Sequence, residues 1–476
     1  MLSRRRLLTA GAALAAAGPL GAMAEEPSRL LKLRRRTIEV KGRPASVYAI
    51  VGEGGEHAFA SEVGSRFRLR VENELAEPSL VHWHGLMPPW RQDGVPEISG
   101  PAIPPGGSAD YDFPLAYAGT YYMHSHFGLQ EQLLFAAPLI VRDPRRYAER
   151  QDVVVMLADF SFRSPQDIFA SLVAAKKHGM PKMALHDGTG AASHEDMGKL
   201  MGKVMGKPDL NDVAYDAFLA NERTIDDPQI IPVENGGRIL LRVINSAAMS
   251  AFRVDLGALG GRLAAVDGQD ILPCAGGNFP IAVGQRLDIL LDLPKGTRAF
   301  PITFVLEGET KQTAVILCPP GARIDRLPEE AAEPAAPLDL ALEKQLRAAA
   351  PLPARKADRV IPINLTGDMA NYVWSINDVV WNEKTPPMTV RAGERVELAI
   401  TNKTMMSHPM HLHGHRFQVV EIDGAPIDGA MRDTVLVPPG KRVVIAFDAD
   451  NPGRWAFHCH LLYHAQAGMF ASFEYA

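Results

Sequence analysis

One strand pattern occurs three times in this 476-residue chain and limits the folds that it can adopt. Each copy reads Gly-x-Arg, then alternating apolar residues, then Asn, over residues 64–73, 236–245 and 393–402. Alternation with a period of two is typical of a strand that buries one face. A second strand pattern follows each copy and begins at Gly106, Gly284 and Gly440. Three copies with similar internal spacing predict a triplicated β-domain.

The repeat predicts an all-β protein with three tandem domains, over residues 30–145, 150–319 and 358–476. Each domain is expected to be a small Greek-key sandwich of two sheets. Residues 320–357 are rich in Pro, Ala and charged side chains, which indicates a linker. One helix is expected within this linker, over residues 338–350.

Residues 1–24 have the pattern of an export signal. Three arginines, Arg4 to Arg6, precede an apolar stretch rich in Ala and Gly, which ends in Ala22-Met23-Ala24. This pattern resembles a twin-arginine signal that is cleaved after Ala24. The apolar stretch is short and weakly apolar for a membrane anchor. We therefore expect export to the bacterial periplasm by the twin-arginine machinery, without stable membrane insertion.

The overall charge is slightly acidic, with a formal net value of −5. Nucleic-acid-binding proteins normally carry a basic excess. The expected partners are therefore small molecules rather than nucleic acids, and the mature protein is expected to be a monomer.

Histidines gather in four short clusters that together hold eleven of the fifteen in the chain. Four pairs have the spacing i, i+2, which places both rings on one face of a strand: His82 and His84, His124 and His126, His411 and His413, His458 and His460. Eight imidazoles are too polar for one core unless something binds them. The four pairs therefore predict a metal centre.

Cys459 lies between His458 and His460, so its thiol points to the opposite face of the strand. Around it in the sequence are His464 and Met469, and His408 is available from the third cluster. Two imidazoles, a thiolate and a weak thioether form a blue-copper electron-transfer site. Zinc could use the Cys and His ligands but needs neither the Met nor a redox change.

These four motifs, in this order, resemble those of the multicopper oxidases, a family built from cupredoxin-like domains. The resemblance implies four copper ions. It implies a type 1 copper held by His408, Cys459 and His464 with Met469 as the axial ligand, and a type 2 copper held by His82 and His411. It also implies a binuclear type 3 site held by six histidines: His84, His124, His126, His413, His458 and His460.

The resemblance also implies the reaction. A phenolic or other aromatic donor, or Cu(I), would be oxidised one electron at a time at the type 1 copper, and O2 would be reduced to water at the other three. Domain 2 has no His in the equivalent strand, residues 302–306, and would hold no copper. An alternative is a copper-resistance protein whose main role is cuprous oxidation or copper binding.

Two positions bear on proton supply. Asp93 matches the acid that the family places near the type 2 copper, although an Asp before Gly94 is also typical of a turn. Many bacterial relatives have an acid directly after the second type 1 histidine. Here that position is Ala465, so water or another acid must take this role.

Residues 177–207 contain five methionines and three histidines, which are soft ligands suited to Cu(I). The segment also contains repeated Met-Gly-Lys triplets, and a flexible loop whose methionines cover apolar surface explains them equally well. Cys274 and Cys318 in domain 2 could form a disulfide or remain thiols. Asp433 could lie near the type 1 pocket, but a structural ion pair with a neighbouring Arg is favoured.

Overall fold

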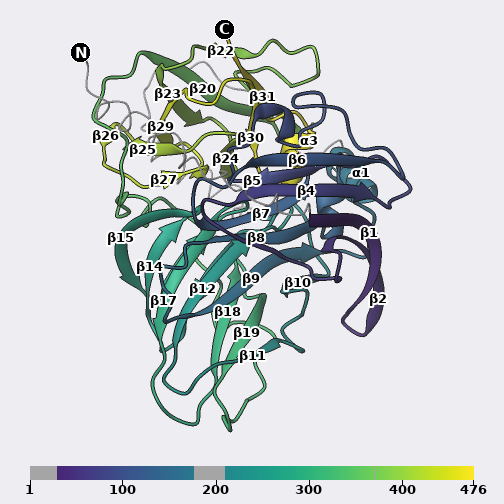
Figure 1. Cartoon of the computed structure of the whole chain (residues 1–476), viewed down its shortest axis with the longest axis vertical. Coiled ribbons are helices and arrows are strands. Elements are labelled where there is room, and N and C mark those ends of the chain that lie inside the picture. The colour runs from purple at the N-terminus through teal and green to yellow at the C-terminus, as the bar shows by residue number, and fades with distance from the viewer. Residues whose placement is uncertain (1–28, 176–209, 370) are drawn as a thin grey trace, which may run out of the picture.

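The computed structural model describes residues 29–175, 210–369 and 371–476, so the signal at 1–24 and the segment 177–207 lie outside the described residues. Within this part the fold is all-β, and its six sheets form three successive pairs along the chain (Figure 1). The helical elements are short: α1 (Pro165–Ala175), α3 (Leu462–Gln466), and the 3-10 turns η1 (Trp90–Gln92) and η2 (Gln130–Leu133). Among the described helices, none is long and apolar enough to cross a membrane.

Each predicted domain contributes two sheets. In domain 1 the strand orders are β2 (Arg43–Gly52), β1 (Arg29–Val40), β4 (Arg66–Asn73), β6 (Ser108–Pro114), and β3 (Phe59–Glu62), β8 (Ala136–Arg142), β7 (Gly119–Ser125), β5 (Val81–His84). In domain 2 they are β10 (Ala217–Ala220), β9 (Gln151–Phe160), β12 (Arg238–Asn245), β17 (Arg286–Asp292), β14 (Gly261–Val266), β15 (Gln269–Gly276), and β11 (Gln229–Pro232), β19 (Gln312–Cys318), β18 (Phe300–Leu306), β13 (Phe252–Asp255), β16 (Asn278–Ile281).

Domain 3 has the same plan. Its strand orders are β21 (Val373–Ile376), β20 (Arg359–Asp368), β23 (Arg395–Asn402), β29 (Arg442–Asp448), β25 (Phe417–Ile422), β26 (Ala425–Pro426), and β22 (Met388–Val390), β31 (Phe470–Tyr475), β30 (Arg454–Cys459), β24 (His408–Leu412), β28 (Thr434–Val437). The short strand β27 (Met431–Arg432) pairs with β25. The expected all-β fold of tandem sandwich domains is confirmed.

The repeated sequence pattern forms equivalent strands, β4, β12 and β23. Each lies between a parallel neighbour, β1, β9 or β20, and an antiparallel neighbour, β6, β17 or β29. The antiparallel neighbours are the strands expected after the repeated glycines. The threefold repeat in the sequence is therefore a threefold repeat of one strand arrangement.

The Asn that ends each repeat is a buried connector rather than only a turn residue. The Asn402 side-chain amide donates to the carbonyls of Met406 and Val437, at 2.7 and 2.8 Å. Asn73 and Asn245 each donate to two carbonyls in the corresponding places. Because such a bond satisfies buried backbone groups, each Asn fixes the turn that leads into the other sheet. In domain 3 that turn leads directly to His408.

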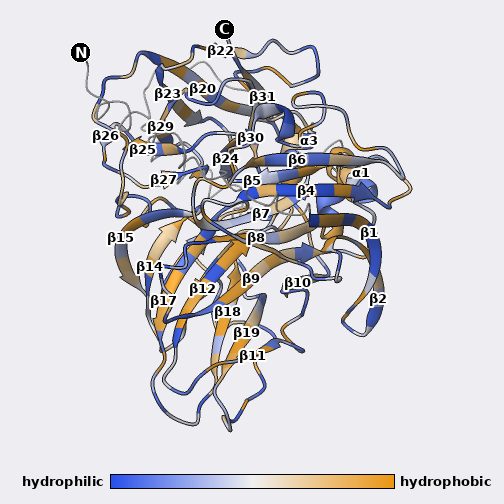
Figure 2. Cartoon of the chain, viewed as in Figure 1, coloured by the Kyte–Doolittle hydropathy of each residue, from blue (hydrophilic) through white to orange (hydrophobic). Residues whose placement is uncertain are grey.

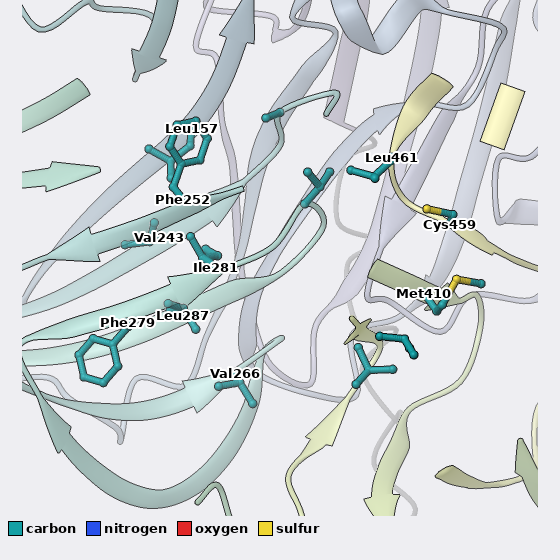
Figure 3. Close-up of a cluster of buried hydrophobic side chains, with 14 of the residues drawn as sticks. Leu157, Val243, Phe252, Val266, Phe279, Ile281, Leu287, Met410, Cys459 and Leu461 are labelled. Atoms are coloured by element: carbon teal, nitrogen blue, oxygen red, sulfur yellow. The ribbon is translucent and has the colours of Figure 1, made fainter. Parts of the chain in front are cut away.

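The largest buried apolar cluster runs from domain 2 into domain 3. Figure 3 shows Val243 and Phe252 of domain 2 in the same cluster as Met410 and Cys459 of domain 3. The apolar strands β12, β17, β18 and β19 dominate the domain 2 part, as Figure 2 shows. Domain 1 has a separate core around Phe67, Trp83 and Phe113. Domains 2 and 3 thus pack as one apolar body that supports the strand of Cys459.

The helix expected over residues 338–350 is wrong, since this described stretch contains turns and isolated bridges and no helix. Leu338, Leu340 and Leu346 are buried, and Glu343 pairs with Arg432 of domain 3 at 2.8 Å. The chain follows an irregular path here, and Leu338 clusters with Ala282 of domain 2 and Leu436 of domain 3. This part of the linker therefore fastens domains 2 and 3 together.

Candidate metal centre

Two pairs of antiparallel strands present the predicted histidines. In domain 1, β5 pairs with β7 so that His82 lies opposite His124. In domain 3, β24 pairs with β30 so that His411 lies opposite His458. Figure 1 shows these two strand pairs next to each other in the middle of the molecule. Strand register therefore brings histidines from both ends of the chain together.

The eight histidines form three groups, and within each group the candidate ligand atoms lie within 4.8 Å of one another. Domains 1 and 3 both contribute to every group. The groups are His84, His124 and His460; His126, His413 and His458; and His82 and His411, joined by His84.

Hydrogen bonds orient most of these rings in the same way. The Nδ1 atoms of His124, His411 and His458 donate to backbone oxygens at 3.1, 2.9 and 2.8 Å. Since one ring nitrogen carries the proton, Nε2 of each ring keeps its lone pair. These bonds fix the tautomer that a metal ligand needs.

The inward nitrogens fit a group of metal ions. The Nε2 atoms of His82, His124 and His411 are buried without a hydrogen-bond partner. His458 Nε2 lies 3.0 Å from His413 Nε2 and 3.3 Å from His126 Nε2, and one proton cannot satisfy three converging lone pairs. Buried polar atoms normally have partners, so this arrangement calls for cations.

Burial favours the neutral form of several of these rings. It lowers the pKa of His458 to about 3 and holds the pKa of His84, His126 and His413 well below the usual value. Neighbouring imidazoles lower the pKa values of the last three further, because like charges repel. Neutral imidazole is the form that binds a metal.

Cys459 belongs to a separate group on the other face of β30. Its Sγ lies 3.5 Å from His408 Nδ1 and 3.9 Å from His464 Nδ1, and the two Nδ1 atoms are 3.2 Å apart. Met469 is buried, and its backbone connects Cys459 and His464 through bonds of 3.1 and 3.0 Å. Burial raises the pKa of the Cys459 thiol, so metal binding would have to displace its proton.

Neighbouring side chains cover the outer edges of His408 and His464. Both rings are fully buried. His408 Nε2 contacts Thr404 Oγ1 at 2.7 Å, and His464 Nε2 contacts Asp212 Oδ2 at 3.0 Å. Trp374 stacks on His464 with ring centres 4.0 Å apart. Asp212 and Trp374 are distant from His464 in the sequence, and Thr404 belongs to no recognised motif, so the sequence did not indicate these three neighbours.

Asp93 holds two of the histidines. Its Oδ2 accepts from His413 Nδ1 at 2.9 Å, and its backbone oxygen accepts from His82 Nδ1 at 2.8 Å. The residue is fully buried. Gly94 has φ +80°, and a Cβ there would lie 1.8 Å from the Val81 carbonyl oxygen, so the chain at Asp93 packs directly on β5.

A cavity of about 430 Å³ reaches the cluster beside Ala465. Its walls include His126, His458 and the carboxyl of Glu131. Glu131 Oε1 is buried without a hydrogen-bond partner and lies 3.4 Å from His124 Nδ1. Glu131 follows the His124 motif by only a few residues, but nothing in the sequence marked its carboxyl as part of the site.

Asp433 lies at the histidine cluster rather than beside His408, Cys459 and His464. Its ion pair is with Arg286 of domain 2, at 2.5 and 2.7 Å, and its Oδ1 also lies 3.2 Å from His84 Nε2. The favoured ion pair is therefore present, but with a distant Arg instead of Arg432. Cys274 and Cys318, for which a disulfide was open, are free thiols.

Comparisons with known proteins agree on one family. Three multicopper oxidase family models match residues 32–146, 151–317 and 355–476. Multicopper oxidase MmcO of Mycobacterium tuberculosis is 32% identical over 423 residues, which covers 87% of this chain and 80% of that protein. Copper resistance protein A of Escherichia coli is 26% identical and covers 86% of both chains.

Solved structures show the same fold. A laccase from Botrytis aclada superposes with a TM-score of 0.72 at 23% identity, over 94% of this chain and 88% of that one. Fet3p, a multicopper oxidase that functions in iron import, gives a TM-score of 0.74 at 20% identity, over 94% and 90%. The chain belongs to the multicopper oxidase family. It is a copper-dependent oxidoreductase that uses O2 as electron acceptor.

Proposed function

We propose that the group around Cys459 and the cluster of eight histidines together hold four copper ions. His408, Cys459 and His464 would hold the type 1 copper with Met469 as axial ligand, and His82 and His411 would hold the type 2 copper. One type 3 copper would be held by His84, His124 and His460, and the other by His126, His413 and His458. The coppers would supply one-electron oxidation of a donor at the first site and reduction of O2 to water at the cluster.

The observation that carries this proposal is the placement of Cys459. Its thiol faces His408 and His464, and the adjoining residues His458 and His460 belong to the histidine cluster. Covalent paths through the adjoining backbone therefore connect the two sites. A copper store would not need such a connection.

Two buried carboxyls are placed to manage protons at the cluster. Asp93 faces His413 and His82, and Glu131 faces His124 from the wall of the 430 Å³ cavity. Reduction of O2 to water consumes protons, and a carboxyl within hydrogen-bond reach can supply them. We assign one proton route to Asp93. We assign the second to Glu131, in place of the acid that many relatives have at the position of Ala465.

The donor site favours Cu(I) over a phenol. A cavity of about 40 Å³ lies beside His408, and Asp212, Met249, Met405 and Met406 contribute to its walls. This volume is close to that of one or two water molecules, too small for an aromatic ring but large enough for a metal ion. Thioethers are soft ligands that select Cu(I). Copper resistance protein A among the relatives agrees with this choice.

We also propose that the protein is exported and acts as a monomer. The arginine-rich start and the small-residue site at residues 22–24 support export to the periplasm by the twin-arginine machinery. That route carries folded proteins, which suits an enzyme loaded with copper before export. We propose a monomer, since each of the three histidine groups is complete within one chain.

The first prediction concerns Cys459→Ser. This variant should lose the intense blue absorption and all donor oxidation, because the thiolate is the type 1 ligand and the path to the cluster. The other three coppers should remain bound in elemental analysis. Cys318→Ser, which removes a free thiol of domain 2, is the matched control and should stay blue. A blue band of full intensity in purified Cys459→Ser would contradict the assignment.

The second prediction concerns Asp93→Asn. The variant keeps an oxygen that faces His413 but cannot donate a proton, so copper content and type 1 reduction should be unchanged. Steady-state O2 consumption should fall by about 10²–10⁴-fold, the usual contribution of a positioned acid. Glu383→Gln, at the exposed wall of the same cavity, should keep its activity. Unchanged O2 consumption in Asp93→Asn would reduce the residue to a structural role.

The third prediction separates the two donors. O2 uptake with Cu(I) and with a dimethoxyphenol should be compared for the wild type, Met405→Leu and a variant with all five methionines of 177–207 changed to Leu. Each change keeps bulk but removes thioether sulfur, so KM for Cu(I) should rise while phenol oxidation is unchanged. Met388→Leu in β22 is the control. Equal loss with both donors would exclude copper capture by these methionines.

A further inference from the structure

Domain 2 contributes no residue to the twelve proposed ligands, yet one of its turns touches the histidine cluster. Gly284 has φ +82°, and a Cβ there would lie 2.8 Å from His460 Cδ2. The next residue, Gln285, donates from Nε2 to the Thr434 carbonyl of domain 3 at 3.2 Å. Close packing of backbone on a ring restricts that ring's position. The turn of domain 2 therefore forms part of the wall of the metal centre.

Arg286, which follows this turn as the first residue of β17, connects all three domains. Its side chain is fully buried. Its Nε donates to the Thr120 carbonyl of domain 1 at 3.1 Å, and its Nη1 donates to the Gly284 carbonyl of its own domain at 3.0 Å. Both Nη atoms donate to the Asp433 carboxylate of domain 3. A planar guanidinium is suited to such a two-point contact, which a lysine cannot reproduce.

Asp433 passes this constraint to two proposed ligands. His84 Nε2 lies 3.2 Å from Asp433 Oδ1, so Nε2 carries the proton and Nδ1 keeps its lone pair. His84 Nδ1 points toward His460 Nε2 at 3.2 Å, into the cluster. The Asp433 backbone oxygen accepts from His411 Nδ1 at 2.9 Å, which leaves Nε2 of His411 inward. One residue thus selects opposite ring nitrogens in two histidines.

Arg286 holds the Asp433 carboxylate in position through both of its Nη atoms. Asp433 is buried beside Asp267, and Asp267 also interacts with Arg432 at 3.1 Å. A buried carboxylate without a cationic partner is strongly disfavoured. Gly85, directly after His84, leaves room for the pair, since a Cβ there would lie 2.4 Å from Arg286 Nη2 and 2.7 Å from Asp433 Oδ2. The ion pair therefore lies against the backbone of the first ligand strand.

We propose that Arg286 is a positioning residue of the metal centre, which fixes His84 and His411 through Asp433. Domain 2 is on this account a structural component of the copper cluster rather than a spacer between the copper-binding domains. The inference rests on the proposed function, because it concerns the same four-copper site. It adds a residue that neither the histidine motifs nor their spacing indicate.

The test uses Arg286→Lys, which keeps the positive charge but cannot reproduce the two-point contact. Full-length protein is loaded with copper and titrated with a chelator, while type 2 copper is followed by electron paramagnetic resonance and type 1 copper by its blue absorption. Loss of an outer contact to a metal ligand typically weakens metal binding about 10–100-fold. We expect a loss of this size for the cluster coppers and altered type 2 resonance parameters, with the blue absorption retained.

Arg242→Lys is the matched control. Arg242 is also a buried arginine of domain 2; it donates to Thr120 Oγ1 and to Asp288 at 2.9 Å, but these contacts lie in the pair of domains 1 and 2. It should lower the melting temperature without changing the type 2 parameters. Asp433→Asn, which keeps the oxygen that faces His84 but removes the charge, should alter the type 2 parameters as Arg286→Lys does.

The inference is overturned if both Arg286→Lys and Asp433→Asn resist the chelator as the wild type does and keep its type 2 resonance parameters. The proposed function would then remain intact. Equal changes in Arg242→Lys would also overturn it, because the effect would then reflect only domain packing. A wild-type protein that binds no copper would instead contradict the proposed function.

Discussion

The structure depends on buried histidine nitrogens that have no hydrogen-bond partner within the protein. Eight imidazoles from domains 1 and 3 turn ring nitrogens toward one another in a buried space. The cost of burying unpaired polar atoms is large, so the arrangement makes sense only with cations between the rings. Each of the three groups joins both domains, and the same cations would therefore hold the two ends of the chain together.

Everything around these nitrogens limits the movement of the rings. Backbone oxygens and Asp93 accept hydrogen bonds from the ring nitrogens that carry protons. Asn402, which ends the third repeat, fixes the turn that leads to the strand starting at His408. Asp433 and Arg286 add a constraint from domain 2. Redox sites benefit from such rigidity because second-layer contacts orient the ligands and tune the metal. The apolar body formed by domains 2 and 3 supports Cys459 from the other side.

The sequence was sufficient to predict the fold class, because the strand pattern occurs three times with similar internal spacing. It was also sufficient to predict a metal centre at the four histidine pairs, because the i, i+2 spacing is local and strands translate it directly into geometry. The assignment of all twelve ligands came from the resemblance to the multicopper oxidases. It could not predict contacts between distant segments, such as Asp212 with His464 or Arg286 with Asp433. The linker helix was wrong for a related reason: Leu338 packs with Ala282 of domain 2 and Leu436 of domain 3, which are contacts between distant segments.

The central claim is that one copper lies beside Cys459 and three lie among the eight histidines. Anomalous diffraction from a crystal of the copper-loaded protein, measured at the copper absorption edge, tests it directly. The account predicts four peaks: one between Cys459, His408 and His464, and three close together between domains 1 and 3. A single peak at Cys459, with the histidine cluster empty, would contradict it.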